Sequence, residues 1–96
     1  MSGSEDVQVR RDDAAGRFEI LVDGVVAGQA EYSDGPDGVR EFTHTVVASE
    51  FSGRGLAGKL VGEALSVTRD EELRVRPTCS FVAGYLEKHP EAADVV

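Results

Sequence analysis

Apolar and polar residues alternate in four segments of the first half of the chain, and this pattern predicts four β-strands. The expected strands are residues 6–11, 17–22, 25–32 and 39–48. Asp23-Gly24, between the second and third strands, predicts a tight two-residue hairpin. Gly28 lies inside the third strand and predicts either a bulge or a close approach of another backbone.

The spacing of apolar residues changes to three and four after residue 53, which predicts a helix over residues 54–70. Its apolar face is formed by Leu56, Ala57, Leu60, Val61, Ala64 and Leu65. A short strand over residues 73–76 follows and is stopped by Pro77. A second helix, expected from Cys79 to about Lys88, has Thr78 as its cap. The side chains expected to face inward on it are Phe81, Val82, Tyr85 and Leu86.

The order β-β-β-β-α-β-α predicts an α+β fold. We expect a mainly antiparallel sheet of about five strands with two helices packed on it. The helix between the fourth and fifth strands is a crossover connection, so these two strands should be parallel. Strict alternation along the fourth strand puts Arg40, Phe42, His44 and Val46 on one face, unless a bulge shifts the register. The residues on its other face are then Glu41, Thr43, Thr45 and Val47.

The chain has 96 residues, so one domain is expected. We expect a flexible tail over residues 1–5 and a single domain over residues 6–96. A formal net charge of −8 argues against nucleic acid or an anionic membrane surface as partner. Since the N-terminus has no secretory pattern and no apolar run could span a membrane, we expect a cytoplasmic protein. With one cysteine and two histidines, no metal site is expected.

The segment between the longest strand and the longest helix is rich in glycine and locally basic. A helix start offers unpaired N–H groups and a partial positive charge, and both suit a phosphate group. Gly53, Gly55 and Gly58 lack the β-carbons that would hold a diphosphate away from the backbone. Arg54 and Lys59 add positive charge. The segment therefore predicts a phosphate site, although such a turn can also serve only to pack helix and strand closely.

Two other phosphate-binding motifs do not fit this segment. The three glycines match G-x-G-x-x-G, but four strands precede them and too little chain follows for a doubly wound dinucleotide fold. The P-loop pattern fails because Leu60, rather than Ser or Thr, follows Gly58-Lys59.

Residues 52–57, Ser-Gly-Arg-Gly-Leu-Ala, resemble the acyl-CoA motif Q/R-x-x-G-x-G/A of the GNAT N-acetyltransferase superfamily, with Ser52 in place of Gln or Arg. Two further segments, His44-Thr45-x-Val47 and the stretch from Pro77 to Glu91, are similar to its minimal, YjdJ-like branch. The resemblance covers about residues 17–94 and implies acetyl-CoA as the cofactor, with its pantetheine arm between the splayed fourth and fifth strands. The residues expected at the coenzyme are Val46, Val47, Ser52, Gly53, Arg54, Gly55, Leu56, Ala57, Gly58 and Lys59.

Acetyl transfer to an amine needs a proton acceptor, a polarised carbonyl and a proton donor for the thiolate. His44 is the first candidate base, because histidine accepts a proton near neutral pH, and Glu41 is an alternative. Cys79, at a helix start, either accepts the acetyl group or lines the coenzyme channel. By the family resemblance, Tyr85 is a candidate proton donor to the thiolate. Each of these residues also has a purely structural interpretation, as a buried, paired or surface side chain.

We therefore expect an acetyl-CoA-dependent N-acetyltransferase that acts on an unidentified amine-bearing acceptor. The alternative is a non-catalytic acyl-CoA or CoA-binding module, and a third possibility is an interaction domain without a ligand. A monomer, or a weak homodimer formed through exposed strand edges, is expected.

Overall fold

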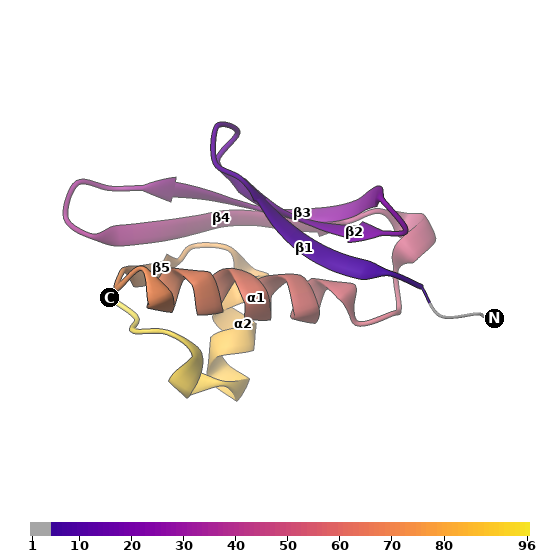
Figure 1. Cartoon of the computed structure of the whole chain (residues 1–96). Helices are drawn as coiled ribbons and strands as arrows, with labels where there is room; N and C mark the ends of the chain where they lie inside the picture. Colours follow the sequence, from indigo (N-terminus) through magenta and orange to yellow (C-terminus); the bar gives the residue numbers. More distant parts are fainter. Residues whose placement is uncertain (1–4) are drawn as a thin grey trace.

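The computed structural model describes residues 5–96, and over this range it has five strands, two α-helices and two short 3-10 helices (Figure 1). The strands are β1 (Val7–Asp12), β2 (Arg17–Val22), β3 (Val25–Asp34), β4 (Val39–Val47) and β5 (Arg74–Pro77). The helices are η1 (Ser49–Phe51), α1 (Leu56–Asp70), α2 (Ser80–Lys88) and η2 (Pro90–Ala92). The predicted α+β fold and its element order are confirmed. The expected tail falls largely on residues 1–4, outside the described residues.

The five strands form one sheet in the order β1-β2-β3-β4-β5, and only the β4–β5 pair is parallel. The predicted crossover is therefore confirmed. β5 pairs with β4 only from Val39 to Phe42, although β4 continues to Val47. The two strands part after Phe42, where its carbonyl oxygen accepts a hydrogen bond of 2.8 Å from the Cys79 N–H group. Beyond this point no strand among residues 5–96 pairs with that edge of β4.

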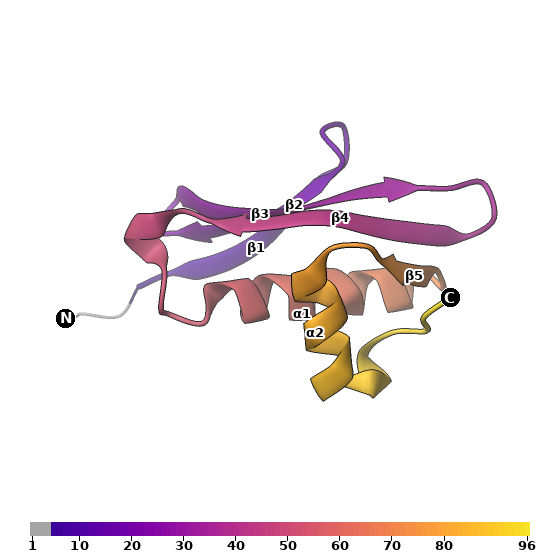
Figure 2. The same ribbon diagram turned by 180° about the vertical axis from the view of Figure 1, so that it is seen from behind.

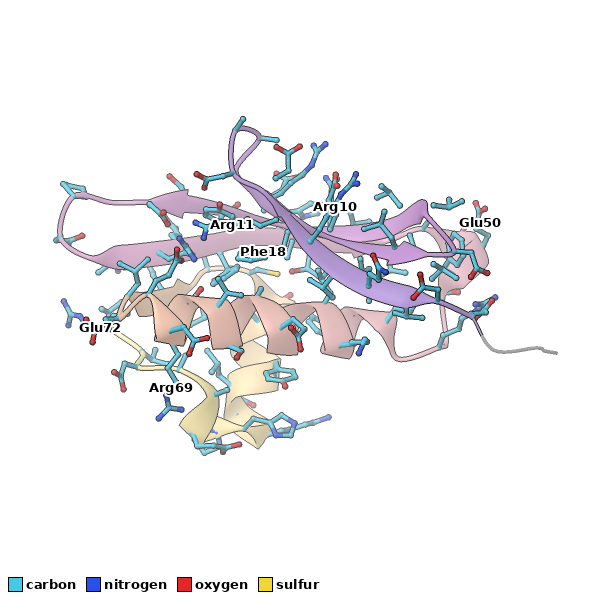
Figure 3. The ribbon with its side chains drawn as sticks, viewed as in Figure 1. Arg10, Arg11, Phe18, Glu50, Arg69 and Glu72 are labelled. Atoms are coloured by element: carbon cyan, nitrogen blue, oxygen red, sulfur yellow. The ribbon has the colours of Figure 1, made fainter. Side chains whose placement is uncertain are left out.

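Both helices cover the same face of the sheet, with α1 lying along β1 to β4 and α2 beside it (Figures 1 and 2). The core lies between this face and the helices, and Phe18 points into it from β2 (Figure 3). Arg10 points to the opposite side, which we call the helix-free face (Figure 3). The side chains that α1 buries are Leu56, Leu60, Val61, Ala64, Leu65 and Thr68. The predicted apolar helix face is confirmed, except that Ala57 is only partly buried.

A bulge in β4 changes which side chains share a face. Tyr32 pairs with Phe42 and Glu31 pairs with His44, so Thr43 is an extra residue in the strand. Phe42 is in the core, and Thr45 and Val47 return to the helix side after the bulge. His44 and Val46 are therefore exposed on the helix-free face. The exception named with the alternation therefore applies, because a bulge shifts the register and one added residue reverses every position that follows it.

Two local predictions in the β2–β3 region are confirmed. Asp23 and Gly24 have φ angles of 50° and 83°, the positive values that a tight I′ hairpin turn requires. At Gly28, a β-carbon would lie 2.7 Å from the carbonyl oxygen of Val46, so the strands approach too closely there for any side chain.

Two expectations for α2 are wrong. Cys79, rather than Thr78, is the residue at the helix cap, and the Thr78 hydroxyl instead donates a hydrogen bond to Glu41. Phe81 was expected to face inward, but it is 41% exposed, because the helix buries only Val82 and Leu86. Within residues 5–96 no helix is long and apolar enough to cross a membrane. Those residues also include no group of three or more metal-ligating side chains.

Candidate coenzyme site

The turn before α1 is built on glycines because its backbone is left-handed at two positions. Gly53 and Gly55 have φ angles of 79° and 74°, which side chains other than glycine seldom adopt. Gly55 is the cap residue of α1, and it provides no side chain to bind the free N–H groups of the helix. The Ser52 hydroxyl donates to the Ser49 carbonyl, 2.8 Å away, and so stays within its own turn.

The backbone N–H groups at the start of α1 are unpaired over an unusually long stretch. The first to find an acceptor is that of Lys59, which donates to the Gly55 carbonyl at 3.2 Å. The N–H groups of residues 53–58 have no acceptor among residues 5–96. A helix ordinarily leaves its first four N–H groups free, and here the glycine turn extends that set toward β4. Their aligned dipoles make this end of α1 electropositive.

A groove of about 260 Å³ lies over this turn. Its lining residues are Val47, Phe51, Ser52, Gly53, Gly55, Leu56, Ala57, Gly58 and Phe81. Seven of these were expected from the sequence, and Phe51 and Phe81 were not. Phe51 directly precedes the turn. Phe81 lies in the first turn of α2, which begins where β5 ends, so the parallel β4–β5 pair was the signal that could have brought it to this groove.

Three residues expected at the coenzyme lie outside the groove lining. Arg54 donates to the Glu5 carboxylate at 2.7 Å and lies over the Phe51 ring, 5.4 Å from its centroid. Lys59 is exposed on the first turns of α1. Val46 points to the helix-free face, where it lines a separate shallow hollow of about 300 Å³ between β3 and β4.

Cys79 is buried where β4 and β5 part, and its sulfur lies 3.4 Å from the Thr45 hydroxyl oxygen. Burial alone raises the pKa of the thiol. The Thr45 hydroxyl and the N–H groups of Val82 and Phe81 favour the thiolate more strongly, so the pKa of Cys79 lies below its ordinary value. Because Val47 lines the groove two residues beyond Thr45, the thiol stands at the β4 side of the groove.

The other candidate catalytic residues lie apart from the groove lining. His44 is on the helix-free face, on the opposite side of β4 from Cys79. Glu41, one residue before Phe42, shares that face, so the bulge brings the two candidate bases to one side of the sheet. The Tyr85 hydroxyl lies over α1, so close to Gly62 that a β-carbon there would be 2.8 Å from it. The Tyr85 ring also packs against His89, with ring centroids 4.5 Å apart.

The parted ends of the parallel β4–β5 pair, and the glycine turn with free N–H groups before α1, are the two features that the resemblance to the GNAT superfamily implied. Residues 17–95 match the family described as GCN5-related N-acetyl-transferase, and the chain belongs to that family. The structure is also similar to the solution NMR structure of a GCN5-like protein from Staphylococcus aureus that is named as a candidate N-acetyltransferase. The TM-score is 0.69 at 24% sequence identity, covering 92% of this chain and 85% of the other. No curated protein matches the chain.

Proposed function

We propose that the protein is an acetyl-CoA-dependent N-acetyltransferase whose coenzyme diphosphate binds the N–H groups of residues 53–58. The observation that carries this proposal is the run of unpaired N–H groups beside the groove. Backbone donors at an electropositive helix start suit a diphosphate. The glycines at positions 53, 55 and 58 let its oxygens reach the backbone, since no atom of residues 5–96 lies within 4 Å of where their β-carbons would be.

The rest of the coenzyme has a path that fits its chemistry. Beyond Phe42, the edge of β4 pairs with no strand among residues 5–96, and such an edge suits the amides of a pantetheine arm. Phe51, Leu56 and Phe81 line the groove and suit its hydrocarbon segments. In this arrangement the arm leads toward Cys79, where β4 and β5 part. Acetyl-CoA supplies an activated acetyl group there, and the chain's residues orient it.

Cys79 has two roles open to it in this proposal. Its lowered pKa favours the thiolate, which is the form that could take the acetyl group covalently. Alternatively, the thiol lines the end of the channel and the amine attacks the thioester directly. Incubation with acetyl-CoA alone, followed by mass spectrometry, distinguishes them, because only the first role leaves an acetyl group on Cys79.

For proton transfer, we propose that an amine entering from the helix-free face loses its proton to His44. This histidine is exposed and lies next to Thr45 in β4, so it is accessible from that side. We propose Tyr85 as the proton donor to the departing thiolate. Its hydroxyl lies at Gly62, one helical turn along α1 from the groove residue Gly58.

The direct test is a titration with acetyl-CoA in which the backbone amide chemical shifts are measured by NMR. We expect the largest changes at residues 53–59. Acetyl-pantetheine is the matched ligand, because it keeps the thioester and arm but lacks the diphosphate, and we expect it to bind at least tenfold more weakly. Equal affinities, or unchanged amide shifts at residues 53–59, would contradict the proposed binding mode.

The competing function is a non-catalytic acyl-CoA-binding module. One observation favours it: His44, the expected base, lies on the face of β4 opposite the groove. The module requires only the glycine turn, whereas the enzyme also requires release of free CoA in the presence of an amine. Coenzyme binding without CoA release across a broad amine panel would support the module and contradict the enzyme.

A further inference from the structure

A second cavity, which the proposed coenzyme site does not use, lies beside the β3–β4 loop. It measures about 180 Å³. Its lining residues are Ser33, Gly35, Asp37, Val39, Glu41 and Arg76. In contrast to the apolar coenzyme groove, this lining carries three charged side chains. Glu41 and its strand neighbours Ser33 and Arg76 share register positions across β3, β4 and β5, so the cavity crosses the three strands.

This cavity lies on the helix-free face, where Glu41 and Arg76 are paired one position before β4 and β5 part. Glu41 accepts a hydrogen bond from the hydroxyl of Thr78, the residue before Cys79. Cys79 itself is held by the carbonyl of Phe42, the residue after Glu41. Along β4, therefore, the charged cavity comes first, the thiol next, and the coenzyme groove at Val47 last. An acceptor in the cavity and a thioester in the groove would then lie on opposite faces of the sheet, on either side of the gap where β4 and β5 part.

The charged groups of the cavity form no ion pairs within the described part of the chain, although Glu41 accepts the hydrogen bond from Thr78. Asp37, Glu41 and Arg76 form no ion pair with any of residues 5–96. The arginines that do pair with carboxylates are Arg10, Arg11, Arg17, Arg40 and Arg54. Arg69 and Arg74 also have no ion pair among these residues, but Arg76 lines a cavity that also holds Asp37 and Glu41. A guanidinium fork matches a carboxylate, and two carboxylates suit an ammonium group.

We propose that this cavity binds the acceptor, and that the acceptor is a small amine that also carries a carboxylate, as an amino acid does. Glu41 and Asp37 hold the ammonium group, and Arg76 holds the carboxylate. This inference rests on the proposed N-acetyltransferase function. In the reaction the amine nitrogen forms a bond to the acetyl carbonyl carbon, and the C–S bond breaks with its electron pair going to sulfur. Of the two protons that the ammonium group loses, one ends on the thiolate and the other goes to solvent.

The test measures release of free CoA from acetyl-CoA with matched acceptors. The panel holds the common amino acids, each beside the amine that remains when its carboxylate is removed. We expect at least one amino acid to exceed its decarboxylated partner at least tenfold in kcat/KM. We also expect that amino acid, added with CoA in place of acetyl-CoA to prevent turnover, to shift the amides of Ser33, Glu41 and Arg76.

Two variants separate the roles of the charged side chains. Arg76→Gln should reduce the preference for the carboxylate-bearing acceptor to below threefold, while Arg74→Gln, on the same strand but outside the cavity, should retain it. Glu41→Gln should raise KM for the acceptor at least tenfold with an unchanged Kd for acetyl-CoA. Its control is Glu63→Gln, an exposed acid on α1 that should leave both constants unchanged.

The outcomes separate this inference from the proposed function. If acetyl-CoA shifts the amides of residues 53–59 but no amino acid exceeds its decarboxylated partner, the acceptor assignment is overturned and the coenzyme site stands. The same holds if Arg76→Gln and Arg74→Gln have equal effects. If acetyl-CoA shifts no amide in that turn, the proposed function fails, and the assignment of this cavity as its acceptor site fails with it.

Discussion

In the described part of the chain, polar groups are unpaired at the N-terminal end of α1 and hydrogen-bonded near its C-terminal end, where Arg40 of β4 lies. At its N-terminal end, the N–H groups of residues 53–58 have no acceptor among residues 5–96 and lie beside a groove. Toward its C-terminal end, the Arg40 side chain is only 1% exposed, and each of its nitrogens has a partner. Arg40 donates to both carboxylate oxygens of Asp34, at 2.7 and 3.0 Å, and to Glu71 at 2.8 Å. It also donates to the Thr68 hydroxyl at 3.1 Å.

We interpret the paired region around Arg40 as structural and the unpaired N–H groups as functional. A buried charge is tolerated only when it is fully paired, and the Arg40 network meets that condition. The guanidinium also lies 4.5 Å from the centroid of the Tyr32 ring, so the network ties β3 and β4 to α1. Arg11 extends it to β1 by donating to Glu71 at 2.7 Å. The N–H groups of residues 53–58 have no acceptor within the described chain, which is why we propose that they bind a ligand.

The largest expected effect is a loss of stability when the hydrogen-bond network of Arg40 is removed. Arg40→Met should lower the free energy of unfolding by about 2–4 kcal/mol, because Asp34 loses its arginine partner and Glu71 loses one of its two. Urea denaturation measures this change. Arg74→Met, an exposed arginine with no paired acid among residues 5–96, should change it by less than about 0.5 kcal/mol. Equal effects of the two variants would contradict the structural role of the network.

The Arg40 network should also make the free energy of unfolding fall at acidic pH. The hydrogen bond from Arg40 lowers the pKa of Asp34, and those from Arg11 and Arg40 lower the pKa of Glu71. A lowered carboxyl pKa contributes stability above the ordinary pKa, and this is lost as the pH falls through the folded-state value. Urea midpoints measured from about pH 6 to about pH 3 should therefore fall below about pH 4.5. Arg40→Met should fall less steeply there, and an unchanged slope would contradict the assignment.

At the N-terminal end of α1, replacing a glycine by a residue with a side chain should weaken coenzyme binding without destabilising the fold. Gly58→Val is the clean probe, because a β-carbon there meets nothing within 4 Å and φ is not positive, whereas Gly55 has a φ of 74°. We expect acetyl-CoA affinity to fall about 10–100-fold by calorimetry, as one blocked charge-assisted contact is worth about 1.4–3 kcal/mol. Gly84→Val, in an equally open position on α2, should leave affinity unchanged. A similar loss in both variants would rule out a local effect.

The pKa of the Cys79 thiol offers a further test. Thr45→Val keeps the side-chain shape but removes the hydroxyl that favours the thiolate, so it should raise the pKa of Cys79. The pH dependence of iodoacetamide alkylation, followed by mass spectrometry, reports this pKa. Thr43→Val is the control, because Thr43 donates to the Glu31 carbonyl instead. An unchanged alkylation profile in Thr45→Val would show that the hydroxyl does not act on the thiol.

The smallest expected effect concerns the ion pair between Arg54, in the glycine turn, and Glu5. Glu5→Gln removes the acid from Arg54, in an ion pair whose side chains are 42% and 46% exposed. Exposed pairs contribute about 0.2–1 kcal/mol, so acetyl-CoA affinity should rise by less than about fivefold, and stability should fall by less than about 1 kcal/mol. The gain should shrink at high salt, where exposed charges are screened. A loss of affinity at low salt would contradict a free Arg54 favouring the coenzyme.

The local sequence determined most of the fold, because short-range periodicity and turn chemistry decide it. The Arg17–Val22 strand and the end of α1 at Asp70 lie at the expected residues. The Asp23-Gly24 hairpin and the parallel β4–β5 pair follow from turn geometry and crossover handedness. The glycine turn was visible for a similar reason, since unpaired N–H groups at a helix start depend only on nearby residues.

Tertiary structure alone decided which side of the sheet each catalytic candidate occupies. The bulge at Thr43 moves His44 and Val46 away from the groove, and it depends on how β4 pairs with β3 rather than on the composition of either strand. The ion pairs of Arg40 with Glu71 and of Arg54 with Glu5 also join residues that are distant in sequence. Periodicity reports only what a residue's near neighbours require, whereas a strand's register and an ion pair are settled by packing across the whole domain.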